Sequence, residues 1–211
     1  MIQNANPVTV SPRPWLRKQH AAGLLMLCFA AAANAHSGEG VAGGFISGFM
    51  HPLSGLDHLL AMVAVGIWGA TLGRPLVWAL PVAFPMLMVV GGVMGIAQVP
   101  LPYVEIGIAA SVVVLGLSIA AAWRAPVAIA VAIVAVFGVF HGYAHGMELP
   151  ETAAPAAFAA GFVISTGLLH LAGIAIGLVK ALPRGEQALR AGGGLIAAMG
   201  VWILAGMPGV A

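Results

Sequence analysis

The chain has 211 residues, of which 61% are hydrophobic and only 7% are charged, and its mean hydropathy is +1.05. This composition excludes an ordinary soluble domain and predicts an all-α membrane protein. The formal net charge is only +2, and the eight Lys and Arg residues are scattered over short connections. They form no basic face, which excludes a nucleic-acid partner.

Residues 1–35 have the pattern of a secretory signal peptide. A positively charged stretch (residues 13–18) precedes a short apolar core (residues 21–33), and Ala33-Asn34-Ala35 then supplies a small-x-small cleavage site. An uncleaved anchor helix is the alternative. Cleavage after Ala35 removes Cys28, the only cysteine, and so excludes disulfides and thiolate metal sites from the mature chain.

Residues 36–211 are predicted to form a single membrane domain of six transmembrane helices. Each apolar stretch has about 20 residues or more, which is enough to cross about 30 Å of hydrocarbon. Connections that contain Pro and Gly separate the stretches. The predicted spans are residues 43–70, 75–97, 103–122, 126–147, 155–179 and 188–207.

Charge predicts the direction of these spans. After residue 35, basic residues occur only in the connections that follow the first, third and fifth spans, whereas the opposite ends carry acidic residues alone. Under the positive-inside rule the odd spans run inward and both mature termini face outward, which agrees with a signal peptide. The basic residues are Arg74, Arg124, Lys180, Arg184 and Arg190.

The fourth span carries a stripe of metal-ligand side chains. His141, His145 and Glu148 are spaced i, i+4 and i+7, so they lie on one helix face. An i, i+4 histidine pair is able to present two imidazole nitrogens to a single ion. Glycines at four-residue spacing beside this stripe, at positions 138, 142 and 146, predict close packing against a neighbouring helix.

The first span carries a second polar group. His51 and His58 are seven residues apart and share a face, whereas Asp57 points about 100° away from His58. Asp57 is therefore either a ligand, if the helix is distorted near Pro52, or a group that orients an imidazole.

Helix rise predicts a ladder of sites across the membrane, if each helix is straight and untilted. His170, on the fifth span, is either part of this ladder or a hydrogen-bonding group between helices. The predicted outer mouth holds Glu105 and Glu148, the upper site holds His51, His141 and His145, and the lower site holds Asp57, His58 and His170.

The two polar stretches resemble the HupE/UreJ family, the hydrogenase and urease accessory membrane proteins. Family members carry a His, five residues and then Asp-His in the first span, which His51, Asp57 and His58 match. They also carry Phe-His-Gly-x-Ala/Val-His-Gly-x-Glu in a later span, and residues 140–148 match this motif completely. The likeness covers nearly the whole mature chain. It implies uptake of Ni²⁺, or in some members Co²⁺, across the bacterial cytoplasmic membrane.

The chemistry of the ligands is compatible with nickel, which accepts imidazole together with carboxylate and does not require thiolate. The metal is then the transported substrate, and no cofactor is required. The predicted partners are the divalent ion and the lipid bilayer, with a cytoplasmic metallochaperone and an oligomer left open. His36 becomes the N-terminus after cleavage, where its amine and imidazole form a chelating pair or, alternatively, remain solvated.

Two other classes of protein compete with a permease. An intramembrane zinc-dependent hydrolase would use three histidines and a carboxylate to hold zinc with an open position for water. A bis-histidine haem protein would use two of the imidazoles as axial ligands. The chain contains no phosphate-cradling loop, which argues against ATP hydrolysis.

Overall fold

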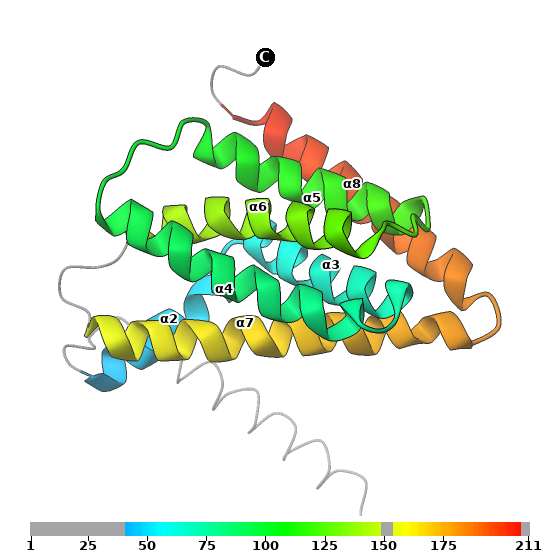
Figure 1. Ribbon diagram of the computed structural model, residues 1–211, viewed down its shortest axis with the longest axis horizontal. Coiled ribbons are helices and arrows are strands. Elements are labelled where there is room, and N and C mark those ends of the chain that lie inside the picture. The colour runs from blue at the N-terminus through cyan, green and yellow to red at the C-terminus, as the bar shows by residue number, and fades with distance from the viewer. Residues whose placement is uncertain (1–40, 149–153, 208–211) are drawn as a thin grey trace, which may run out of the picture. The chain divides into compact units, whose positions relative to one another are not determined.

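A computed structural model of the chain describes residues 41–148 and 154–207 (Figure 1). Every regular element in these residues is helical, which confirms the predicted all-α fold. The predicted signal peptide and His36 lie outside the described residues. The elements are α2 (Val41–Ser54), α3 (Leu56–Leu72), α4 (Leu76–Ile96), α5 (Val104–Ala120), α6 (Val127–Met147), α7 (Pro155–Gly177), the 3-10 helix η2 (Leu178–Ala181) and α8 (Gly185–Ala205).

The predicted spans correspond to helices of unequal length. Four helices, namely α4, α6, α7 continued by η2, and α8, are long and apolar enough to cross a membrane. The pair α2 and α3 adds a fifth if it counts as one span. The third predicted span forms α5, which is apolar but has only 17 residues. A helix of that length is about 25 Å long, which is close to the thickness of the hydrocarbon core.

The predicted span over residues 43–70 is not a straight helix, and the distortion expected near Pro52 is a full break. The chain breaks at Gly55, and α2 and α3 meet at an angle of 80°. Pro52 lies in the last turn of α2, where its missing N–H weakens the helical hydrogen bonding, and Gly55 adopts an extended conformation (φ −94°, ψ 118°). This bend lies between His51 and His58 and therefore sets how the two imidazoles are placed relative to each other.

Close backbone contacts hold the helices together. α4 packs along α6, α5 along α8, and α7 along both α2 and α3. The glycine stripe on α6 faces α4 as predicted, since a Cβ atom at Gly142 would collide with the backbone of Met88 and one at Gly146 with that of Gly92. Small residues at such spacing let helices approach closely in lipid, where dispersion contacts drive association.

The basic residues of the described ranges gather at one end of this helical unit. In Figure 1 the connections from α3 to α4, from α5 to α6 and from α7 to α8 all lie at the right-hand end. Lys180 donates hydrogen bonds to the carbonyl oxygens of Ala70 and Thr71 at the end of α3. The Nε atom of Arg190 donates to the carbonyl oxygen of Ala120 at the end of α5, at 2.9 Å.

Candidate metal site

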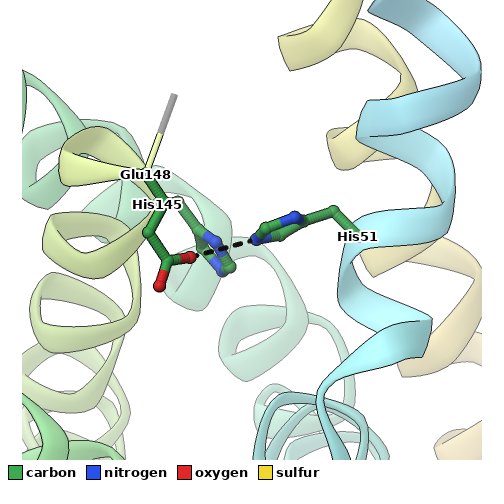
Figure 2. A group of neighbouring side chains, drawn as sticks. All are labelled: His51, His145 and Glu148. Atoms are coloured by element: carbon green, nitrogen blue, oxygen red, sulfur yellow. Dashed lines mark ion pairs between the residues drawn. The ribbon is translucent and has the colours of Figure 1, made fainter. Parts of the chain in front are cut away.

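His51, His145 and Glu148 form a group with ligand atoms close enough to share one ion (Figure 2). One donor atom from each residue lies within 4.8 Å of the others. The Nε2 atom of His51 is 3.4 Å from an Oε atom of Glu148. His145 is buried, His51 is partly buried and Glu148 is exposed, so the group is open on the carboxylate side.

Four imidazoles from three helices form one continuous group, which we call the histidine cluster: His51, His58, His141 and His145. The ring centroid of His145 lies 4.8 Å from that of His51 and 4.5 Å from that of His58. The His58 ring is also 4.7 Å from the His141 ring. The predicted division into upper and lower sites therefore differs from the structure, because the bend at Gly55 brings His58 against His141 and His145.

Asp57 orients the imidazole of His58. One carboxylate oxygen of Asp57 accepts a hydrogen bond from the backbone N–H of His58 and lies 2.8 Å from its Nδ1 atom. An ionised carboxylate can only accept, so the Nδ1 atom carries the proton and the Nε2 atom keeps its lone pair. That Nε2 atom is buried and has no hydrogen-bond partner in the described part of the chain.

Ser111 on α5 plays the corresponding part for His141. Its hydroxyl donates to the carbonyl oxygen of Ile108 at 2.6 Å, and its Oγ atom lies 2.9 Å from the Nε2 atom of His141. Because the hydroxyl proton is already used, the Nε2 atom of His141 donates and its Nδ1 atom keeps a lone pair. Our sequence analysis missed Ser111, because nothing marks a single serine in an apolar span as the partner of a distant histidine.

The cluster contains four buried imidazole nitrogens without a hydrogen-bond partner among the described residues: His58 Nε2, His141 Nδ1, and both ring nitrogens of His145. A buried polar atom without a partner costs about 1–3 kcal/mol. Folded proteins rarely leave several such atoms together, and those that do usually hold an ion, a water or a functional group there. A neutral imidazole carries a proton on one ring nitrogen, so His145 offers one lone pair and three of these four atoms are able to bind a cation.

His170 and Glu105 lie apart from this cluster. His170 is buried on α7, with both ring nitrogens unpartnered within the described ranges, and its ring contacts Phe84, with centroids 5.6 Å apart. Phe84 also contacts His141 at 5.3 Å, so a phenyl ring links the two imidazoles. Glu105 is exposed in the first turn of α5 and is not in the three-residue group of His51, His145 and Glu148.

These features define a multi-pass helical membrane protein with histidine and carboxylate groups whose donor atoms are close enough to share a cation. The family model described as "HupE / UreJ protein" matches residues 24–203. Protein HupE of Rhizobium leguminosarum bv. viciae is 42% identical over 183 residues, which cover 87% of this chain and 95% of that relative. The chain therefore belongs to the HupE/UreJ family, whose members are accessory permeases and not enzymes. No solved structure matches the chain.

Proposed function

We propose that the protein imports Ni²⁺, or Co²⁺, through the histidine cluster and across the bacterial cytoplasmic membrane, to supply hydrogenase or urease maturation. The observation that carries this proposal is the set of unpartnered imidazole nitrogens on His58, His141 and His145, the last of which is grouped with His51 and Glu148. Membership of the HupE/UreJ family supports the same function. Ionisable and polar groups inside a membrane protein typically mark the path of an ion.

The route that we propose begins at the outer mouth, where Glu105 and Glu148 attract the cation. His51, His145 and Glu148 then hold it in the group shown in Figure 2. Transfer to His58 and His141 follows, because their rings contact those of the first group. His170, beyond Phe84, is the next position inward. Several neighbouring sites of moderate affinity let an ion enter and also leave.

The charges of the site suit a divalent ion. Neutral imidazoles contribute lone pairs without charge, so the ion's two positive charges are balanced by Glu148 at one side and Asp57 behind His58. Imidazole and carboxylate donors accept nickel and cobalt, and no thiolate is needed. This route also fits six spans with both mature termini outside, since the acidic mouth then faces outward and the basic end faces inward.

The decisive experiment is uptake of radiolabelled nickel into proteoliposomes. We expect uptake that depends on the protein and that is lost in His145→Ala, because the ring of this residue contacts those of both His51 and His58. Glu148→Gln should also reduce uptake, whereas the matched variant Glu186→Gln, at the opposite end of the protein, should not. Folded, monodisperse wild-type protein that transports neither nickel nor cobalt would overturn the proposal.

The two competing classes are less well supported. Membership of the HupE/UreJ family does not favour a zinc-dependent hydrolase. Ser54, the hydroxyl nearest to His51 in sequence, donates its proton to the carbonyl oxygen of His51 and not to an imidazole that would act as a base. In the three ring pairs that are in contact, the centroids are 4.5–4.8 Å apart, which leaves no room for a haem plane between the two imidazoles of such a pair.

A further inference from the structure

The end of the helical unit opposite the histidine cluster contains a positively charged cavity. A cavity of about 460 Å³ lies between the ends of α3, α6 and η2 and is lined by Arg74, Arg124 and Lys180. A smaller adjoining pocket shares Arg124 and Lys180 and adds Arg190. Arg74, Arg124 and Lys180 thus line the larger cavity, and Arg190, on α8, lines the adjoining pocket; we call these two adjoining spaces together the basic cavity.

These four charges have no acidic partner within the described ranges. The ion pairs of that part of the chain, His51 with Glu148 and His58 with Asp57, lie elsewhere. Glu186 lines the smaller pocket but forms no ion pair there. Lys180 and Arg190 are held in place by backbone carbonyl oxygens at the ends of α3 and α5. Arg74 and Arg124 take part in no side-chain hydrogen bond among the described residues, so their guanidinium groups are available to a ligand.

The chemistry of the cavity suits a phosphate group. A guanidinium presents planar pairs of N–H donors that match phosphate oxygens, and a fixed ammonium adds a further point charge. Such charge-assisted hydrogen bonds are among the stronger polar contacts in proteins. Four cations gathered around a cavity repel one another unless an anion enters it.

The rim of the cavity favours a lipid over a soluble anion. Trp123 and Val127, at the rim, are 41% and 48% exposed and lie at the junction of α5 and α6. Tryptophan is enriched at the boundary between lipid tails and headgroups. A phospholipid is able to contact the cations with its headgroup and the exposed apolar side chains with its acyl chains. Basic pockets between membrane helices are known to bind anionic headgroups.

We propose that the basic cavity binds the phosphate group of an anionic phospholipid in the leaflet on that side of the membrane. The positive-inside rule explains why basic residues occur at this end, but it does not require that they converge on one cavity. Arg184 shows the difference, because it lies in the same connection as Lys180 and lines neither pocket. The proposal stands apart from metal transport, although a bound anion would also reduce the repulsion of a cation that arrives at this end.

Native mass spectrometry of the detergent-purified protein tests the proposal. The probes are phosphatidylglycerol and phosphatidylcholine with identical acyl chains, and inorganic phosphate as a competitor. We expect the protein to retain one phosphatidylglycerol with about tenfold higher affinity than phosphatidylcholine, because the cations of the cavity would repel the choline group that the second lipid carries beside its phosphate. Arg124→Gln should remove most of this preference, and Arg184→Gln, which deletes the same charge outside the cavity, should retain it.

Three outcomes would overturn the proposal. Equal retention of the two lipids by the wild-type protein would show that the cavity does not select an anionic headgroup. An equal loss in Arg124→Gln and Arg184→Gln would show that net charge, and not the cavity, attracts the lipid. Displacement of phosphatidylglycerol by millimolar inorganic phosphate would assign the site to a soluble anion. Because this experiment does not measure nickel uptake, a negative result for lipid binding would not bear on the proposed transport function.

Discussion

The Nε2 atom of His141 lies 2.9 Å from the Oγ atom of Ser111, in a contact between α6 and α5 that is fully buried. The serine hydroxyl donates its only proton to the carbonyl oxygen of Ile108. The hydrogen bond therefore fixes one tautomer of His141, with the proton on Nε2 and a lone pair on Nδ1. Asp57 fixes His58 in the opposite tautomer, so each imidazole keeps one free lone pair.

Ser111→Ala should weaken nickel transport, because His141 would lose the acceptor that fixes its tautomer. Partners of this kind typically change metal affinity by about 10–100-fold. We expect the nickel concentration for half-maximal uptake to rise by about tenfold, with the protein still folded. Ser118→Ala is the matched control, since Ser118 is buried on the same helix and bonds only the carbonyl oxygen of Val114. Equal effects of the two variants would argue against a role for Ser111 at the site.

Asp57→Asn should impair transport through the tautomer of His58. An amide presents an N–H₂ donor as well as an oxygen, so it allows His58 to accept at Nδ1 and place its proton on Nε2, the atom otherwise free to bind metal. We expect nickel affinity to fall by about 10–100-fold, measured from the concentration dependence of uptake. Wild-type affinity in a folded Asp57→Asn protein would show that neither the carboxylate nor the tautomer matters.

Spacing along single helices predicted much of the fold and part of the site. The stripe of His141, His145 and Glu148 and the glycines on α6 repeat at helical intervals, so a periodic pattern is sufficient to place them. The bend at Gly55 could not be placed in this way, because Pro52 makes a distortion plausible without fixing its position or angle. Contacts between helices, such as that of Ser111 with His141 or the approach of Arg74 and Lys180, depend on how the helices pack. A periodic pattern along one helix does not reveal that packing.

Nickel uptake should fall as the outside solution is made more acidic, because protons compete with the metal for the imidazole nitrogens. Only the neutral ring binds a metal, so protonation of His51 or its neighbours removes a ligand and places a positive charge on the route. The initial rate should be measured between about pH 5 and 8 with a protonophore present, so that the pH changes without a proton gradient. A flat profile would count against histidine ligation as the limiting contact.

Gly173→Ala should destabilise the fold by about 1–3 kcal/mol, the usual cost of overpacking. A Cβ atom at Gly173 would collide with the backbone of Val63, where α7 packs on α3. Gly167→Ala is the control on the same helix, because a Cβ atom there meets nothing within 4 Å. It should leave stability unchanged or raise it by up to about 1 kcal/mol, since alanine is the better helix former. Thermal unfolding in detergent measures both changes, and a comparable loss in the two variants would contradict the observed α3–α7 packing.

Single cysteines test the predicted orientation, because the only natural cysteine, Cys28, lies within the predicted signal peptide. Gln187→Cys and Met207→Cys place a thiol near the beginning and just beyond the end of α8. If the basic end faces inward, a membrane-impermeant maleimide should label Met207→Cys in spheroplasts and Gln187→Cys only after the membrane is permeabilised. The unmodified chain should stay unlabelled after denaturation, because cleavage removes Cys28. Labelling of Gln187→Cys in intact spheroplasts would reverse the orientation and place the histidine cluster at the inner side, in which case the acidic mouth would release the ion and not capture it.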